Sequence, residues 1–397
     1  MKFLLIYVPN LRFSFEEDWC TSTIGENFRL SSGLTPSTKE KAYFNNGIIP
    51  WINSGELKNK YISSTENKLT LDAVKKHNLT IYPMDTMVIA IYGLEAAGVR
   101  GKASITKMDS TISQSCMAFN SLGNVLTQFM YYVYKKEAQI LGTRYAQGTK
   151  QQNLSSDLLS SYKLLYPSKE EQLKIVNFLS LIDEKIETQI KIIADCLSYR
   201  NAIVDYFFES LSSNWRQVKL SNILKEYSEL HVKDNSIIHA TLSKEGIYPK
   251  TDRYDRDFLV KDEEKKYKVS HLNDICYNPA NLKFGVITRN TFGDCIISPI
   301  YITFTINNNY LPKFVELLVT RKQFITQARK YEQGTVYERM AVNSSDLLSM
   351  NVFIPSLSIQ QKIVDIVDII DNKITNEKEL LNLYKMQKDY LLKNMFI

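Results

Sequence analysis

Two polar segments of the chain carry the residue types most suited to chemistry at a nucleic acid. The first runs from Gly142 to Asn153 and the second from Arg329 to Arg339. Arg, Lys, Gln and Asn can hydrogen-bond purine edges in the major groove, and Glu can accept a hydrogen bond from cytosine. We expect DNA contacts from Arg144, Lys150, Gln151, Gln152 and Asn153 in the first segment, and from Lys330, Tyr337, Glu338 and Arg339 in the second. Two ordinary surface loops are the alternative.

A second group of candidates lies in Gly-containing segments that follow expected strands. It comprises Arg100 and Lys102 in the first half of the chain, with Asn281, Lys283 and Arg289 in the second. Further phosphate contacts could come from Lys58, Lys60, Tyr61, Arg253, Tyr254 and Arg256. Taken singly, each of these residues also fits an ordinary solvated surface.

The motifs of catalysis are incomplete in this sequence. The segment Gly98–Ser104 lacks the spacing of a P-loop, and the tetrad Asn278–Asn281 lacks the second Pro and the aromatic residue of amino-methyltransferases, so we expect a turn there. The four His and five Cys show no metal-ligand spacing. We therefore expect no catalytic residue, no metal ligand and no cofactor in this chain, although a dispersed nuclease cluster of Asp, Glu and Lys stays open.

Composition places the chain among globular proteins. It has 397 residues, 44% hydrophobic and 23% charged, with a net charge of +6. This length corresponds to two or three domains, and the mildly basic balance is compatible with nucleic acid without proving it. An apolar run of the roughly 20 residues that cross a membrane is missing from the sequence, and scattered cysteines favour a reduced cytoplasm.

The sequence repeats itself with an offset of 188 residues. The word Ser155–Ser160 returns nearly in that register as Ser344–Ser349, Lys174-Ile175-Val176 returns as Lys362-Ile363-Val364, and Ile182-Asp183 returns as Ile370-Asp371. Fainter echoes pair Asp85 with Asp274 and Trp19 with Trp215. A period this long indicates a duplicated domain pair, with a boundary near Ser212–Asn214.

Each half ends in a segment that predicts one long helix. Residues 169–211 contain no Pro or Gly and carry apolar residues at steps of three and four, from Ile175 to Leu211. The second stretch repeats this pattern, and Arg200 and Lys388 interrupt the two apolar seams at equivalent places. Capping boxes are expected at Ser168–Glu171 and Ser358–Gln361. Forty-three helical residues would span about 64 Å.

A narrow apolar stripe on a helix of this length requires a partner. We expect the two helices to pair with each other, antiparallel, because a duplicated unit closes most simply about a pseudo-two-fold axis. Packing of each helix onto its own globular domain, or a coiled coil between copies of the chain, are the alternatives.

The chain resembles the specificity (S) subunit of type I restriction-modification enzymes. The resemblance rests on the series Gln-Gly-Thr, Ser-Ser-Asp-Leu-Leu-Ser, Pro, Lys-Ile-Val and Ile-Asp-x-Lys-Ile, present in both halves, and on Trp51–Leu57 and Tyr61–Glu66. It covers nearly the whole chain, although the second globular part echoes the first only faintly.

The resemblance implies an α+β protein with two mixed α/β target-recognition domains joined by two long antiparallel helices, an intramolecular coiled coil. The expected domains are 1–166, the first recognition domain; 167–212, the first spacer helix; 213–354, the second recognition domain; and 355–397, the second spacer helix. The resemblance further implies a cytoplasmic, non-catalytic subunit that reads a split target in double-stranded DNA.

The same resemblance implies two methyltransferase subunits docked on this chain, and restriction subunits beside them. S-adenosylmethionine, ATP and Mg would then belong to those partners. Two other functions stay open from the residues alone: a coiled-coil scaffold that binds no DNA, and a self-sufficient nuclease or methyltransferase with a cryptic site.

Overall fold

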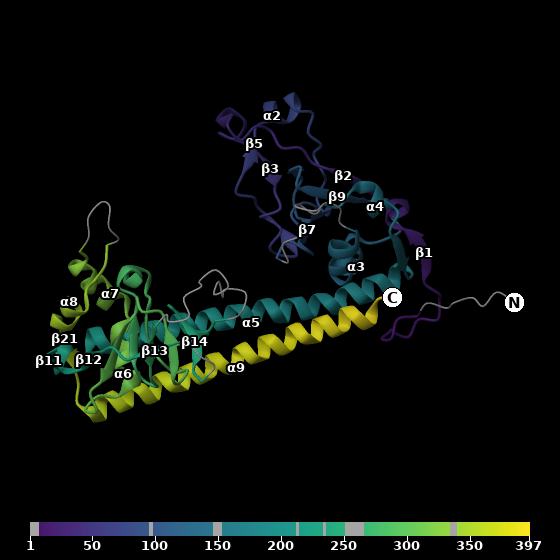
Figure 1. Ribbon diagram of the computed structural model, residues 1–397. Coiled ribbons are helices and arrows are strands. Elements are labelled where there is room, and N and C mark those ends of the chain that lie inside the picture. The colour runs from purple at the N-terminus through teal and green to yellow at the C-terminus, as the bar shows by residue number, and fades with distance from the viewer. Residues whose placement is uncertain are drawn as a thin grey trace. The chain divides into compact units, whose positions relative to one another are not determined.

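The computed structural model describes residues 8–94, 98–145, 153–211, 214–232, 236–250, 266–333 and 340–397 (Figure 1). The chain forms two compact units: unit 1 is Met1–Ile190 with Glu379–Ile397, and unit 2 is Lys191–Lys378. Helices α5 (Lys169–Ser210) and α9 (Leu357–Met395) each contribute to both units. Mixed sheets and helices confirm the expected α+β class, while the four domain segments drawn from the sequence stay a prediction.

Unit 1 is built around a five-stranded sheet in the order β2-β9-β6-β7-β4. Its strands are β2 (Phe28–Ser32), β9 (Cys116–Ser121), β6 (Met87–Ala90), β7 (Ala103–Thr106) and β4 (Tyr61–Ile62). The central strand β6 is buried along its whole length, as its uninterrupted apolar sequence predicts. Helix α3 (Thr127–Ile140) joins the same core, in which Phe119 and Phe129 are fully buried.

The remaining elements of unit 1 form smaller layers. Strand β1 (Cys20–Thr23) pairs antiparallel with β10 (Lys163–Tyr166), and the order β5-β3-β8 makes a three-stranded sheet. The other elements are α1 (Ile24–Asn27), a 3₁₀ turn (Lys41–Tyr43), β3 (Ile49–Ile52), β5 (Lys68–Leu69), α2 (Leu71–Lys76), β8 (Thr111–Ile112), a π-helical turn (Leu141–Tyr145) and α4 (Ser156–Ser160).

Unit 2 repeats the central sheet with four strands in the order β12-β20-β17-β18. These strands are β12 (Leu224–Tyr227), β20 (Ile302–Ile306), β17 (Ile275–Tyr277) and β18 (Ile287–Arg289). Met87 of β6 faces Phe119 of β9 in unit 1, and Ile275 of β17 faces Phe304 of β20 in unit 2. Strand β11 (Arg216–Lys219) pairs with β21 (Asn351–Ile354) as β1 pairs with β10. The duplication expected from the sequence is therefore present in the strand register.

The two units differ in what is added to this common frame. Unit 2 carries a second sheet in the order β13-β16-β19-β14-β15, where unit 1 has its three-stranded sheet. In this sheet β14 (Ile238–Ser243) pairs antiparallel with β15 (Gly246–Pro249) and parallel with β19 (Cys295–Ile297), just as β3 pairs with β5 and β8 in unit 1. The added strands are therefore β13 (Leu230–Val232) and β16 (Lys266–Ser270). Its helices are α6 (Pro312–Thr320), α7 (Lys322–Ala328) and α8 (Ser344–Ser349), with 3₁₀ turns at Leu220–Asn222, Pro279–Phe284 and Arg329–Tyr331.

Within each unit, α5 and α9 lie side by side and antiparallel (Figure 1). In unit 1, Asp183 of α5 pairs with Lys388 of α9 at 2.6 Å, and in unit 2 Arg200 of α5 pairs with Asp371 of α9. The repeat relates Asp183 to Asp371 and Arg200 to Lys388. The two ion pairs are therefore equivalent, but the aspartate lies on α5 in unit 1 and on α9 in unit 2. This confirms the expected antiparallel pair, and each helix also joins the hydrophobic core of its unit.

The apolar seams are not buried along their full length. Ile175, Leu179 and Ile182 are buried in the core of unit 1, whereas Ile190 and Leu197 are 48% and 40% exposed. The apolar seam of α5 is therefore partly exposed near the middle of the helix, although Ile193 between these two residues is buried. Burial follows the globular parts of the units, because their side chains cover the helix ends.

The helix starts also differ in detail from the expected capping boxes. Ser168 caps α5 through a hydrogen bond from Glu171 N at 3.4 Å, but the Glu171 carboxylate binds Arg12 instead of reaching back. Helix α9 begins at Leu357, so Ser358 lies inside its first turn and Ser356 is the residue before the helix. The cap therefore sits 188 residues after Ser168, as the repeat itself requires.

A buried glutamine fixes the start of each long helix to its globular part. Gln172 Oε1 accepts a hydrogen bond from Leu126 N, directly before α3, at 2.8 Å, and Gln360 Oε1 accepts one from Leu311 N, directly before α6, at 3.1 Å. Both amides also donate to the carbonyl of the proline that precedes their helix. These bonds hold equivalent helices at equivalent places in the two units.

The turn before the central strand needs one correction. The residues with left-handed backbone are Asp85, at φ 61°, and Asn273, at φ 73°. The equivalent of Asp85 is therefore Asn273 and not Asp274, since both residues lie two positions before their strands. Asn and Asp tolerate this conformation better than other non-Gly residues.

Candidate nucleic-acid interface

The two polar loops leave the common frame at equivalent points. In unit 1, Leu154 N donates to Ile91 O at 3.0 Å, and in unit 2 Val342 N donates to Pro279 O at 3.2 Å. Both partners of the first bond are related to those of the second by the offset of 188. Each loop is thus anchored beside the end of the central strand of its sheet, β6 or β17.

Most of the residues predicted to read bases lie outside the described residues. These are Lys150, Gln151, Gln152, Tyr337, Glu338 and Arg339, together with the side chain of Arg144. Their DNA contacts stay a prediction. The described ends of the loops are well anchored: Gln333 and Ala341 exchange two backbone hydrogen bonds of 2.8 and 2.9 Å across the second loop.

Arg100 lies against the first polar loop in unit 1. Its Nε donates to Leu94 O at 2.6 Å, and its side chain lies so close to Gly142 that a Cβ there would meet it at 2.9 Å. Lys102 and Asn153 are half-buried. The Oδ1 of Asn153 is buried and has no hydrogen-bond partner among the described residues. The structure thus brings Arg100 to the base of the loop that contains Asn153.

Lys60 belongs to a buried network at helix α5. Its ammonium donates to Tyr132 Oη at 2.7 Å and to Ser180 Oγ at 2.8 Å, and it lies 3.6 Å from an Asp183 carboxylate oxygen. Burial lowers the pKa of Lys60, and the charge of Asp183 partly opposes this shift. The phosphate contact expected for Lys60 is therefore wrong in this conformation, because its charge is held inside the unit.

Lys135 of α3 supports the Gly-containing turn that carries Arg100. Its Nζ donates to Gly101 O at 2.6 Å, and burial lowers its pKa to about 8, assisted by the positive charge of Lys388 and opposed by Asp183. Gly101 adopts φ 75°, which a side chain would strain. A titrating lysine thus holds the backbone of a candidate contact loop.

The stability of unit 1 should therefore depend on pH through Lys135. Between about pH 8 and 10.5 the folded lysine is neutral while the unfolded one is still charged, so the unfolded chain binds the extra proton. We expect the free energy of unfolding, measured relative to a Lys135→Met variant, to rise by about 2 kcal/mol across this interval. Urea denaturation of both proteins at pH 7.5 and 10 measures the difference; a gap that stays constant would contradict the assignment.

The candidates in unit 2 divide into exposed and engaged side chains. Lys283 and Lys330 are exposed. Arg289 instead pairs with Glu316 at 2.9 Å and donates to Asn273 Oδ1 at 2.6 Å, so its guanidinium is tied inside the unit. Asn281 donates its backbone N–H to Asn278 Oδ1 at 3.3 Å, which confirms the expected turn at Asn278–Asn281. DNA contact by Asn281, Lys283, Arg289 and Lys330 stays a prediction.

Two residues near these candidates were missed in the sequence. Phe284, 65% exposed, follows Lys283, whose ammonium lies 5.2 Å from its ring centre. Lys244 lies in the turn of the β14–β15 hairpin, and its Cβ would be 4.0 Å from a Cβ added at Gly285. The pairing of β14 with β15 corresponds to that of β3 with β5 in unit 1, but only two residues separate β14 from β15, whereas 15 separate β3 from β5. An exposed aromatic ring beside lysines suits stacking on bases or sugars.

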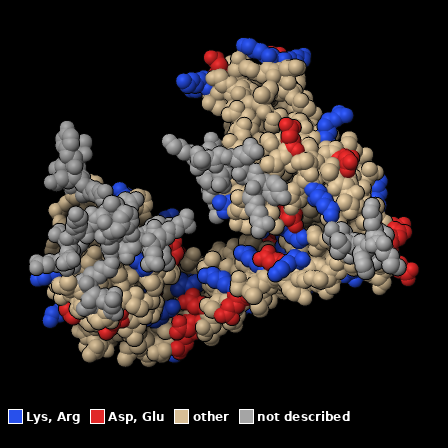
Figure 2. Space-filling view, turned by 45° about the vertical axis from the view of Figure 1, so that its right-hand side comes forward, with Lys and Arg blue, Asp and Glu red and all other residues tan. Residues whose placement is uncertain are grey.

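Charge on the described surface is mixed. Figure 2 shows basic and acidic side chains interspersed on the face in view, without one continuous basic region. In the described ranges, no group of three or more His, Cys, Asp or Glu could hold a metal ion. Among those same residues, no helix is long and apolar enough to cross a membrane.

Comparison with known sequences places both halves in one family. The family model described as type I restriction modification DNA specificity domain matches residues 16–194 and 276–384. The type I restriction enzyme MjaIX specificity subunit of Methanocaldococcus jannaschii is 31% identical over 206 residues, 50% of this chain and 44% of the relative. The EcoR124I/EcoR124II specificity subunit of Escherichia coli is 25% identical over 220 residues, 54% of each chain. The matched regions span about half the length of these two relatives.

Solved structures agree with this assignment at the level of the fold. The match to a type I restriction-modification S subunit from M. genitalium covers 98% of the present chain and 99% of the solved chain, with a TM-score of 0.54 and 17% identity. A second solved chain comes from a structure whose subject is complex assembly and conformational transition of the type I R-M system. Its match covers 97% of the present chain and 99% of the solved chain, with a TM-score of 0.61 and 11% identity. Since the family model matches more than half of the residues, in both halves, this chain belongs to the type I restriction modification DNA specificity domain family.

Proposed function

We propose that this chain is the DNA-binding specificity subunit of a type I restriction-modification assembly and reads a two-part target in double-stranded DNA. The observation that carries the proposal is the duplicated frame. Equivalent hydrogen bonds, Leu154 to Ile91 and Val342 to Pro279, fix two loops of different polar sequence at equivalent points. A common frame with different contact residues is what two readers of different half-sites need.

The same proposal assigns catalysis to partners. Two methyltransferase subunits would dock on this chain, with restriction subunits beside them, and S-adenosylmethionine, ATP and Mg would be bound by those partners. Two observations support this division of roles. The relatives are named specificity subunits, and one protein of similar fold comes from a structure of type I R-M complex assembly.

Binding of DNA by the assembled complex is the direct test. The chain is co-expressed with its cognate type I methyltransferase subunit, and affinity for duplex DNA is measured between 50 and 200 mM salt. We expect affinity to fall by roughly 10³-fold over this range, because contacts to several phosphates release counterions. Methylation-sensitive sequencing of DNA from expressing cells should then give a target with two separated parts.

Two results would contradict the proposal. An assembly without measurable, salt-sensitive DNA affinity would favour the coiled-coil scaffold. Methyl transfer or cleavage by the purified chain alone, with metal and methyl donor added, would favour the self-sufficient enzyme.

A further inference from the structure

In unit 1, an extended segment of the chain, residues 8–18, covers the start of helix α5. Arg12 of this segment binds the Glu171 carboxylate through Nε at 2.9 Å and Nη2 at 2.8 Å. The Nε1 of Trp19 donates to the same carboxylate at 3.4 Å. As a result the side chain of Glu171 is only 1% exposed.

Aromatic side chains extend this cover along the helix. The ring of Phe13 meets Phe178 of α5 edge-on with centres 5.8 Å apart, and the Lys174 ammonium lies 5.2 Å from the Phe13 centre. The backbone is fixed as well, because Leu11 N donates to Asn394 O of α9 at 2.8 Å. An arginine, an aromatic ring and a main-chain hydrogen bond thus seat the segment.

The equivalent surface of unit 2 lacks such a cover among the described residues. The repeat relates Glu171 to Ile359 and Phe178 to Ile366, and these isoleucines are 39% and 41% exposed. Leu357, the first residue of α9, is 51% exposed. Only four residues separate the end of α5 at Ser210 from Trp215, the equivalent of Trp19, so this part of the chain has no segment comparable to residues 8–18.

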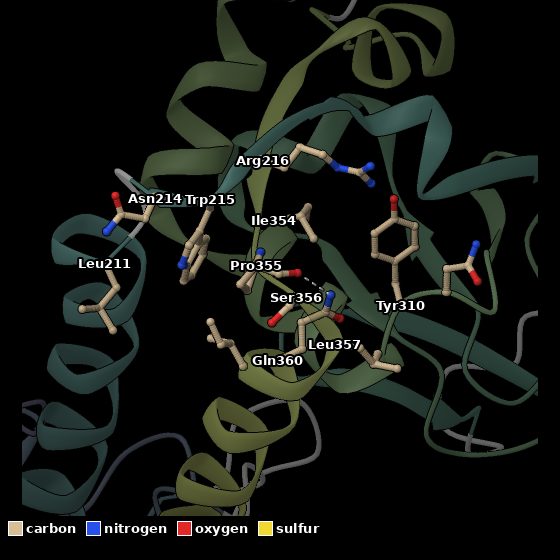
Figure 3. A pocket seen from close by; sticks show the side chains of 12 residues that line it. Leu211, Asn214, Trp215, Arg216, Tyr310, Ile354, Pro355, Ser356, Leu357 and Gln360 are labelled. Carbon is tan, nitrogen blue, oxygen red and sulfur yellow. Dashed lines mark hydrogen bonds between the residues drawn. The ribbon is translucent and has the colours of Figure 1, made fainter.

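A cavity of about 750 Å³ lies at this uncovered place (Figure 3). Its apolar lining comes from Leu211, Trp215, Tyr310, Pro355, Leu357 and Ile359. The Gln360 amide donates to Pro355 O at 3.1 Å, which fixes the floor of the cavity before anything binds. Polar side chains, among them Asn214, Asn309 and Ser356, line the cavity beside these apolar ones. A preformed cavity of this mixed lining, beside exposed apolar helix residues, can hold an anchor side chain of a partner.

Charge at the cavity indicates what kind of segment fits. In unit 1 the floor carries a carboxylate, Glu171, and receives Arg12. In unit 2 the equivalent position is Ile359, and the exposed Arg216 lines the cavity. Lys362, the equivalent of Lys174, is exposed on α9 and available to an aromatic ring. The site therefore suits a segment with three features. An apolar anchor would take the place that Arg12 has in unit 1, an aromatic side chain would lie near Lys362, and a carboxylate would pair with Arg216.

We propose that this cavity and the adjoining face of α9 dock an extended segment of the methyltransferase subunit, one that carries an aromatic or aliphatic anchor and an acidic residue. This inference deepens the proposed function and rests on it. Because residues 8–18 already fill the equivalent place in unit 1, each chain binds one such segment, at unit 2. The two ends of the duplicated chain are thus unequal in how they hold their partners.

The test uses the full chain with Leu357→Asp and Ile359→Asp, made singly. Both side chains are partly exposed, so a carboxylate there should leave the fold intact, and circular dichroism checks this. We expect each variant to weaken methyltransferase binding at one of two sites by at least about tenfold, with stoichiometry in analytical ultracentrifugation falling toward one. Ile300→Asp, at an isoleucine 63% exposed in the same unit and outside the cavity, is the matched control and should bind as the wild type does.

The other outcomes each overturn the proposal. Wild-type affinity and stoichiometry in both variants would show that the cavity takes no part in assembly. Self-association of the wild type that both variants abolish, with methyltransferase binding unchanged, would show that a second copy of the chain is the occupant. A wild type that binds no methyltransferase also overturns the docking proposal. Failure of the proposed function is a different result: the assembly forms, but it shows no salt-sensitive affinity for DNA.

Discussion

Replacing Asp183 with Ala is expected to destabilise unit 1 by about 3 kcal/mol. The Asp183 carboxylate accepts a hydrogen bond from Tyr132 Oη at 2.6 Å and pairs with Lys388 at 2.6 Å and Lys60 at 3.6 Å. The Lys60 side chain is only 7% exposed. Without the aspartate, a buried ammonium would lose its counter-charge or its proton, and either change costs free energy.

The repeat supplies a matched control at Asp371. This carboxylate pairs with Arg200 and with Lys313, the latter at 2.7 Å, but the two cations are 24% and 23% exposed. Water can replace the lost partner there, so Asp371→Ala should cost about 1 kcal/mol in unit 2. The difference between the two variants measures the combined effect of the buried Lys60 and of the Tyr132 hydrogen bond, both of which are found only at Asp183.

The three tryptophans allow each unit to be followed separately. Trp19 and Trp51 lie in unit 1, and Trp215 lies in unit 2. Urea unfolding monitored by fluorescence in a Trp215→Phe background reports unit 1 and the Asp183 effect. A background with Phe at positions 19 and 51 reports unit 2 and the Asp371 effect. Equal losses for both alanine variants would contradict the role assigned to burial.

Single substitutions in the two polar loops should each relax recognition of one half-site. Gln151→Ala is expected to lower affinity for the intact target by about 1–3 kcal/mol, roughly 5- to 150-fold, by removing hydrogen bonds to a base edge. Arg339→Ala should do the same at the other half-site. Each variant should lose less affinity than the wild type when its own half-site is scrambled, and as much as the wild type when the other half-site is scrambled.

Competition binding against four duplexes measures this: the intact target, either half-site scrambled, and both scrambled. Asn308→Ala, a polar truncation at an exposed position of unit 2 outside the loop, serves as the control and should match the wild type on every duplex. A variant that loses affinity equally on specific and random DNA would identify a phosphate contact instead of a base contact.

Much of this architecture could be predicted because its signals are local or repeated. The absence of Pro and Gly in residues 169–210 predicts an uninterrupted helix, and the structure confirms it as α5. The seam interruptions at Arg200 and Lys388 are visible in the sequence, but their partners Asp371 and Asp183 are not. The strand at Met87–Ala90 follows from its apolar run. Backbone preference and periodicity act over a few residues, so sequence reports them directly.

Partners far apart in sequence could not be predicted in this way. Glu171 resembled a capping residue, yet its carboxylate lies beside Arg12, 159 residues away, which provides a stronger, charge-assisted bond. Lys60 resembled a solvated phosphate contact, yet it lies against α5. In both cases a charged side chain found a buried partner that only folding brings within reach.

That the chain is a duplicated α+β protein with two long helices could be read from its residues, because sequence repeats and helical periodicity are visible without knowledge of contacts between distant residues. Three other features follow only from the folded structure: which lysines and arginines are held inside the units, where each loop is anchored, and that residues 8–18 cover the start of α5. No described segment covers the equivalent position at Ile359. Burial and pairing of charge depend on distances between remote residues, which no local pattern encodes.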